Sequence, residues 1–167
     1  EDAVEKEKSN PLSREDRAAT PSPLGKIPCL VTDDGQSVFD SPVIMEYLDT
    51  VCDGPEMLPK SGDARWTVLR RQATADGMIG SMVTCFVESL KKPERQSGGV
   101  LAHNKGIVFN GIAALEQEAA SFGETVDVGT ISIAVALSFA DQTFPEDDWR
   151  TDNPALAAWF DAFDQRP

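Results

Sequence analysis

The segment KIPCLVTDDGQSVFDSP, residues 26–42, carries the strongest local structural signals in the sequence. Its short apolar run, residues 27–31, is followed by the turn signal DDGQ and then by residues 37–39. An Asp-Gly turn between two such runs predicts a β-hairpin. A helix is expected to follow at once, because Ser41 is a favourable N-cap and Pro42 suits the first helical position.

Helical spacing continues after the hairpin. Apolar residues repeat with the helical period at Ile44, Tyr47, Leu48, Val51 and Cys52, which predicts one inward face. The turn signal at residues 53–55 is expected to end this helix. Before the hairpin, Ser13 with Asp16 predicts a short capped helix that Pro21 ends. We expect residues 1–10 to form a strand.

The rest of the chain is predicted to be helical. Asp63 is expected to cap a long helix that Pro93 ends, and its inward stripe is Val68, Leu69, Ala75, Ile79, Met82, Val83, Phe86 and Leu90. Gly77 and Gly80 lie in its middle, where each costs up to about 1 kcal/mol relative to Ala. Either a neighbouring backbone approaches there or the helix bends.

Three further helices are predicted. The first covers residues 99–121, and Gly123 suits its C-terminal cap. The second, around residues 131–140, is apolar on all sides, so we expect it to be buried on every side. The last helix starts at residue 154 and turns Leu156, Trp159, Phe160 and Phe163 inward.

The charge balance excludes some classes of partner. Among 167 residues, 15 Lys and Arg stand against 28 Asp and Glu, a net charge of −13. Such a surface repels phosphate backbones and anionic membranes, and the basic residues cluster only in pairs, so we expect no nucleic-acid or membrane partner. The longest nearly apolar run, residues 131–140, is far shorter than the about 20 residues of a spanning helix.

The cysteine and histidine pattern disfavours a metal site. Cys29, Cys52 and Cys85 are widely spaced, and the single histidine, His103, is next to none of them. We therefore assign no metal ligand and no disulfide. We expect buried or half-buried free thiols in a reducing cytosol, with Cys29 in the core and His103 facing solvent.

Several short motifs, in the expected order, resemble those of a known family. SPLGKIP, residues 22–28, resembles the N-P-x-G-K-[VI]-P element of glutathione transferases, and DSPVI, residues 40–44, resembles their [ED]-S-x-A-I element. ADG at residues 75–77 and three stretches between residues 148 and 167 are similar to bacterial members. The resemblance implies an α/β thioredoxin-like lobe, with the partial order β-α-β-β-α, followed by an all-α helical-bundle domain.

The resemblance also implies domain limits and shows two departures. The glutathione-binding domain is expected at residues 1–54, a linker at 55–62 and the helical domain at 63–167. The family's first β-α unit, which carries the Tyr, Ser or Cys that activates the glutathione thiol, has no counterpart here. We therefore assign no catalytic residue and expect either a partial sequence or a chain without the activating group. Gly129-x-x-Ser132 replaces the family's Ser/Thr-x-x-Asp cap.

The glutathione site implied by the resemblance consists of Lys26, Ile27, Pro28, Asp40 and Ser41. A cis bond before Pro28 turns the Ile27 N–H and C=O outward, where they pair with the cysteinyl unit of the peptide. Ser41 at a helix N-terminus favours a carboxylate, and Asp40 faces the ammonium group. The residues alone leave open a trans proline, a simple helix cap and a solvated Lys26.

The implied function is a cytoplasmic glutathione transferase, with glutathione as co-substrate and no metal. Its thiolate attacks a hydrophobic electrophile or reduces a disulfide or peroxide. Met78 and Met82 are candidates for the wall of the second-substrate site, with core packing as the alternative. The first two helices of the helical half are expected to pair in a homodimer. The competing function is a transferase-like module that binds a partner or ligand without chemistry.

Overall fold

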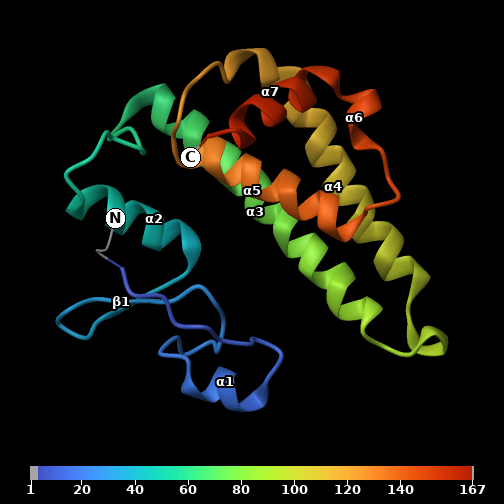
Figure 1. Ribbon diagram of the computed structural model, residues 1–167, viewed down its shortest axis with the longest axis horizontal. Helices are drawn as coiled ribbons and strands as arrows, with labels where there is room; N and C mark the ends of the chain where they lie inside the picture. The colour runs from blue at the N-terminus through green and yellow to red at the C-terminus, as the bar shows by residue number, and fades with distance from the viewer. Residues whose placement is uncertain (1–3, 167) are drawn as a thin grey trace. The chain divides into compact units, whose positions relative to one another are not determined.

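The computed structural model describes residues 4–166 and divides into two compact units between residues 56 and 57 (Figure 1). Residues 1–3, part of the expected first strand, and Pro167, the end of the C-terminal motif, lie outside the described residues. The first unit contains α1 (Arg14–Ala19), β1 (Leu30–Val31), β2 (Ser37–Val38) and α2 (Ser41–Val51).

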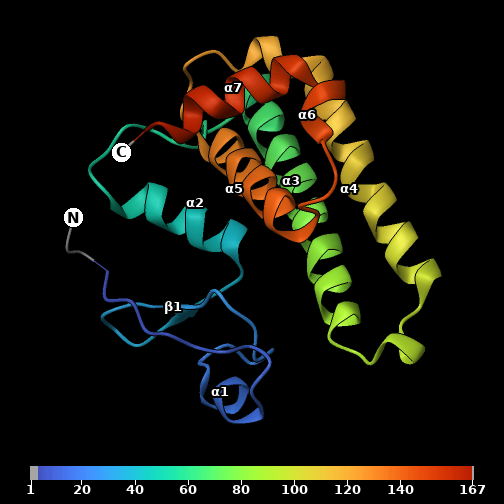
Figure 2. The same ribbon diagram turned by 45° about the vertical axis from the view of Figure 1, so that its right-hand side comes forward.

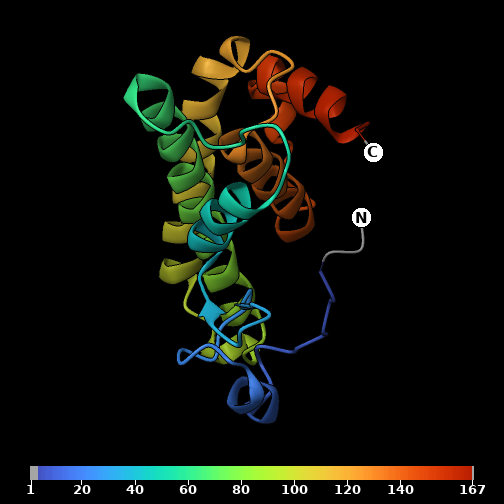
Figure 3. The same ribbon diagram turned by 90° about the vertical axis from the view of Figure 1, so that its left-hand side faces the viewer.

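The second unit is helical. The long helices α3 (Gly62–Ser89) and α4 (Gly98–Glu118) form a hairpin through the 3-10 turn η1 (Pro93–Arg95), and α5 (Val128–Thr143) packs along α3 (Figure 2, Figure 3). The turn η2 (Ala119–Ser121) and the helices α6 (Trp149–Asp152) and α7 (Pro154–Asp164) complete the unit. The expected order of an α/β lobe and an all-helical domain is confirmed.

Local signals determine most of the first unit. The Ser13 side chain accepts a hydrogen bond from the Asp16 N–H at 3.3 Å, which confirms the capped helix α1. The predicted hairpin is also confirmed: Leu30 pairs with Val38 and Val31 with Ser37. The hairpin loop passes through Gly35, whose φ of 84° lies in the left-handed region that favours glycine.

The predicted strand at residues 1–10 is wrong over its described part. Residues 4–10 contain no strand, and the only sheet among residues 4–166 is the pair β1–β2. The reason is composition: residues 5–8 are all charged, so the segment has no alternating apolar face to bury. Val4, the apolar residue at its start, is exposed.

The helix α2 is less buried than its apolar spacing predicts. Ile44, Tyr47 and Leu48 are half-buried, whereas Val51 and Cys52 are exposed, so the expected inward stripe is correct only in its first turns. The two-residue strands are only about 7 Å long, while an 11-residue helix spans about 16 Å. The hairpin therefore covers only part of α2.

The core of the second unit comes from α3, α4, α5 and α7. Its fully buried large side chains include Met78, Met82, Ile112, Leu115, Ile133, Leu137 and Leu156. Met78 and Met82 are therefore core residues, which confirms the core-packing alternative and removes them as candidates for the wall of a second-substrate site. On the outer surface of α4, His103 faces solvent as expected.

The buried face of α3 differs from the predicted stripe. Val83, Phe86 and Leu90 are exposed, so their prediction as inward residues is wrong. Polar residues replace them on the buried face, namely Arg71, Gln72, Ser81 and Glu88. A pattern built on apolar residues does not include these positions. A polar side chain is buried only where hydrogen-bond partners satisfy it, and those partners lie on other segments of the chain.

Arg71 and Glu88 have those partners. Arg71 donates to Glu118 at 3.2 Å and to the Ser121 hydroxyl at 2.7 Å, and its guanidinium lies 4.4 Å from the Phe122 ring centroid. Glu88 accepts the Ser97 N–H at 2.7 Å and the Lys91 ammonium at 2.5 Å. The hydrogen bond from Lys91 is the main cause that lowers the pKa of Glu88.

Helix caps also differ from the predicted ones. The N-cap of α3 is Ser61, and Asp63 lies in the first turn. At α5, the N-cap is Asp127, whose side chain accepts the Thr130 N–H while the Thr130 hydroxyl accepts the Asp127 N–H. This reciprocal capping box lies two residues before the pair Gly129-x-x-Ser132 that was expected at the helix start, and it satisfies two backbone donors at once.

Glycines show how closely the helices pack. A Cβ on Gly129 would lie 2.9 Å from the Val68 carbonyl oxygen, so α5 approaches the α3 backbone there. At Gly77 and Gly80, a Cβ would meet nothing within 4 Å, so among the described residues of the second unit no neighbouring backbone approaches there, which was one of the two alternatives. The close approach of two helices is found at Gly129.

Burial on every side is not observed for α5. Its residues Ile133, Ala136, Leu137 and Ala140 are buried, but Val135 is 54% exposed and Ile131 and Phe139 are only half-buried. The expectation is therefore wrong for one side of the helix, because α3 and α7 cover only its other sides.

Candidate functional site

The hairpin brings the two predicted halves of the site to the same end. Because Leu30 pairs with Val38 in antiparallel register, the residues before β1 and those after β2 lie at one end of the ladder. The segment at residues 26–28 precedes β1, and residues 40–41 follow β2. The described geometry thus places the five predicted site residues on one hairpin end.

The segment before β1 exposes its backbone. The Ile27–Pro28 bond is cis, in agreement with the expectation, and the Phe39–Asp40 bond is cis as well. Lys26 and Pro28 are exposed, and Ile27 is 49% exposed. The Ile27 N–H and C=O have no backbone hydrogen-bond partner among residues 4–166, so both groups are available to a peptide.

The N-terminus of α2 lacks a side-chain cap. The N-cap is Asp40 rather than the predicted Ser41, which is the first helical residue, and Pro42 follows it. The Asp40 side chain makes no cap hydrogen bond, and the Asp40 carbonyl accepts from the Ile44 N–H. Since proline has no N–H, the free backbone donors of the first turn are those of Ser41 and Val43.

Several other helices are capped, although α3 and α7 also lack a side-chain cap bond. Ser13 caps α1, Ser97 caps α4 and Asp127 caps α5, each through a side-chain oxygen that accepts a backbone N–H. At α2 the corresponding donors, together with the helix dipole, are free to receive an external carboxylate. An exposed carboxylate at Asp40 is next to them and suits an ammonium group.

The cysteines are less buried than predicted. Cys29 is half-buried rather than in the core, and Cys52 is exposed, because the short hairpin shields neither residue fully. Cys85 is buried, and desolvation is the main cause that raises the pKa of its thiol. No group of three or more His, Cys, Asp or Glu side chains in the described part of the chain is placed to hold a metal ion.

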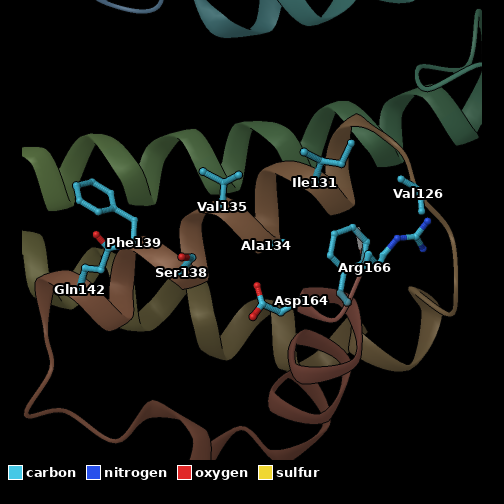
Figure 4. A pocket seen from close by; sticks show the side chains of 10 residues that line it. Val126, Ile131, Ala134, Val135, Ser138, Phe139, Gln142, Asp164 and Arg166 are labelled. Carbon is cyan, nitrogen blue, oxygen red and sulfur yellow. The ribbon is translucent and has the colours of Figure 1, made fainter. Parts of the chain in front are cut away.

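A groove that the sequence did not predict lies in the second unit. It has a volume of about 690 Å³ and follows the open side of α5. Figure 4 shows Ile131, Val135 and Phe139 along α5, with Asp164 and Arg166 from the C-terminal end of the chain. Apolar spacing cannot reveal which side of an all-apolar helix stays uncovered, so no sequence signal marked this groove.

Within residues 4–166, no helix combines the length and the apolarity that a membrane crossing requires.

The sequence matches two domain models of a known family. Residues 1–51 match the glutathione S-transferase N-terminal domain, and residues 99–162 match the glutathione S-transferase C-terminal domain. The uncharacterized GST-like protein YibF of Escherichia coli (strain K12) is 30% identical over 149 residues, which cover 87% of this chain and 74% of YibF. The chain belongs to the glutathione S-transferase family.

Solved structures agree with this assignment. A glutathione transferase family member from Pseudomonas fluorescens Pf-5, with bound glutathione, is 36% identical and superposes with a TM-score of 0.91 over 99% of this chain and 82% of that chain. A structure of a family member from the same strain, with bound S-(propanoic acid)-glutathione, is 38% identical, with a TM-score of 0.82 over 90% of this chain and 77% of that chain.

Proposed function

We propose that this protein binds glutathione through its first unit and is a cytoplasmic glutathione transferase. The observation that carries the proposal is the uncapped N-terminus of α2, with Asp40 and Ser41 at the hairpin end that also holds the free Ile27 backbone. The similarity to the Pseudomonas fluorescens Pf-5 protein with bound glutathione supports it. The proposed binding domain spans residues 1–54, followed by a linker at 55–62 and a helical domain at 63–167.

Each proposed contact matches one group of the tripeptide. The γ-glutamyl carboxylate accepts from the Ser41 N–H and hydroxyl and from the Val43 N–H, and the ammonium group faces Asp40. The cysteinyl N–H and C=O pair with the Ile27 backbone in the manner of an added strand. Lys26 supplies a positive charge near the second carboxylate. Such contacts contribute about 0.5–1.5 kcal/mol each, so a handful suits an affinity in the millimolar range, about 4 kcal/mol.

The proposed reaction is attack by the glutathione sulfur. As a thiolate, it forms a thioether with a hydrophobic electrophile and displaces the leaving group. Alternatively, it attacks a disulfide or peroxide, breaks the S–S or O–O bond and is itself oxidised, ending in a disulfide with a second thiol. The S-substituted glutathione bound by the Pseudomonas fluorescens Pf-5 family member favours the first course. No residue of this chain is assigned as the group that activates the thiol.

The test is glutathione binding by calorimetry. We expect Ser41→Ala to weaken binding several-fold, because it removes a hydroxyl donor from the carboxylate site, and Asp40→Asn to weaken it as well. Ser61→Ala is the matched control, since Ser61 is also a serine at an N-terminus without a side-chain cap bond. Equal affinities for Ser41→Ala and the wild type would refute the site. Binding without turnover of any electrophile would support the non-catalytic alternative.

Homodimer formation through α3 and α4 is a further part of the proposal. Gly77 and Gly80 face open space in the middle of α3, and Val83 and Phe86 continue the exposed face. Helix-interior glycines are unfavourable unless a close approach uses them, and a second copy supplies one. We expect Gly80→Glu to convert a dimer to a monomer in sedimentation experiments. A wild type that is monomeric at micromolar concentration would refute this part.

A further inference from the structure

A compact turn precedes the proposed Lys26–Pro28 contacts. Ser22, which is buried, accepts the Gly25 N–H at 2.9 Å with its carbonyl and the Leu24 N–H at 3.3 Å with its hydroxyl. The turn ends at Gly25, whose φ of 59° lies in the left-handed region. The next residue is Lys26, so the conformation of Gly25 sets the direction in which the site segment leaves the turn.

Gly25 also lies against the backbone of α1. A Cβ there would be 3.1 Å from the Arg17 carbonyl oxygen and 3.2 Å from the Arg17 Cβ. Glycine places only a hydrogen in this direction. A Cβ would require the turn or the helix to shift by a few tenths of an ångström.

The Arg17 carbonyl is available for this contact for a local reason. Its helical donor would be the N–H of residue 21, which is a proline and has none. The helix α1 has no buried residue, so no apolar stripe of its own fixes it in place. Gly25 therefore packs against the backbone of α1 at Arg17.

We propose that Gly25, seated on Arg17 of α1, is a positioning residue that aims residues 26–28 at glutathione. This inference rests on the proposed function. It assigns α1 a structural role that none of its exposed side chains suggests. The backbone of the helix supports the loop that binds the cysteinyl unit of glutathione. Residues 40–41 belong to the other side of the hairpin and do not depend on this support.

The chain offers a matched control for backbone strain. Gly35 has a φ of 84°, also in the left-handed region, but a Cβ there would meet nothing within 4 Å. Gly35→Ala therefore introduces the same kind of strain without a contact, whereas Gly25→Ala introduces both. Gly25→Asn completes the set, because asparagine tolerates a positive φ and still carries the Cβ that meets Arg17.

The first measurement is the glutathione affinity of each variant, taken by calorimetry at a temperature where circular dichroism matches the wild type. We expect Gly25→Ala and Gly25→Asn each to weaken binding by about fivefold or more, and Gly35→Ala to leave it unchanged. Gly25→Asn serves as the test if strain alone prevents Gly25→Ala from folding. Wild-type affinity in a folded Gly25→Asn protein would overturn the inference.

A double-mutant cycle separates positioning from general destabilisation. In the Gly25→Asn background, we expect Lys26→Ala to lose its effect on affinity, because the segment is already displaced, while Ser41→Ala keeps its full effect. Full effects of both substitutions would mean a merely structural role and would overturn the inference. A wild type that does not bind glutathione would refute the proposed function, and this inference with it.

Discussion

Different interactions stabilise each of the two units. The hydrophobic core consists of side chains from residues 75–160, all in the second unit, whereas α1 and α2 of the first unit have no buried residue. In the first unit, the structure depends on turns, on the cap at Ser13 and on the hairpin register. The comparison indicates that local backbone chemistry defines the proposed binding surface, and that packing between distant segments defines the helical unit.

Intrinsic fluorescence can follow the second unit separately. All three tryptophans, Trp66, Trp149 and Trp159, lie in it, and the single tyrosine, Tyr47, lies in the first unit. Denaturation monitored by tryptophan emission therefore reports the helical unit, and this separation lets each prediction below test one side of the comparison.

The largest effect is expected in the core. Leu137 is fully buried in α5, and Leu137→Ala should lower the free energy of unfolding of the second unit by about 2–5 kcal/mol, because it leaves a cavity. Val135→Ala on the same helix removes an exposed side chain and should change stability little. Similar losses for both variants in urea titrations would contradict a core on one side of α5.

Glycine substitutions should rank by what a Cβ meets. Gly129→Ala places a Cβ 2.9 Å from a backbone oxygen and should destabilise the unit by about 1–3 kcal/mol. Gly111→Ala places it 2.7 Å from the Cγ and Sδ atoms of the buried Met78, so it should also destabilise the unit, by no more than Gly129→Ala because a methionine side chain adapts more readily than a backbone. Gly106→Ala meets nothing within 4 Å and should stabilise α4 by about 0.5–1 kcal/mol. Thermal melts that reverse this order would contradict the packing described for α3, α4 and α5.

Acid should weaken the second unit through two carboxylates. The bidentate hydrogen bond from Arg70 is the main cause that lowers the pKa of Glu118, and that from Arg150 is the main cause that lowers the pKa of Asp141. Because both pKa values are lower in the folded state, the stabilisation by the two ionised carboxylates is complete above the unfolded pKa values, about 4. It is lost as the pH falls through the folded pKa values.

The measurement is the pH dependence of unfolding by tryptophan emission. We expect the free energy of unfolding to fall as the pH drops below about 4. Asp141→Asn should flatten part of this dependence, because the amide cannot titrate. An unchanged slope in that variant would show that the Arg150 pair does not contribute to it.

Sequence reasoning succeeded where the signal is local. Residues 30–38 form the predicted hairpin because the Asp-Gly turn and the flanking apolar runs lie side by side in the chain. Ser13 and Asp16 form the predicted cap for the same reason. The hairpin end that holds residues 26–28 and 40–41 was likewise accessible from the sequence, although their binding role stays a prediction.

Sequence reasoning failed where burial depends on partners far along the chain. Arg71 is buried because Glu118, Ser121 and Phe122 surround it, and none of these lies within the window that defines a helical stripe. The exposed side of α5 depends on which helices happen to cover it. The uncapped start of α2 was also missed, because the sequence Asp-Ser-Pro allows either Asp40 or Ser41 as the cap.

The bond between Glu88 and the Ser97 N–H has a consequence for how the chain tolerates change. The carboxylate of Glu88, near the end of α3, accepts the N–H of Ser97, which caps α4, so this bond ties the end of one helix to the start of the next. An amino acid added between them would have to bulge out of the connection, or the carboxylate would lose this donor. Changes in the length of the connection should therefore cost more than exchanges of its exposed side chains.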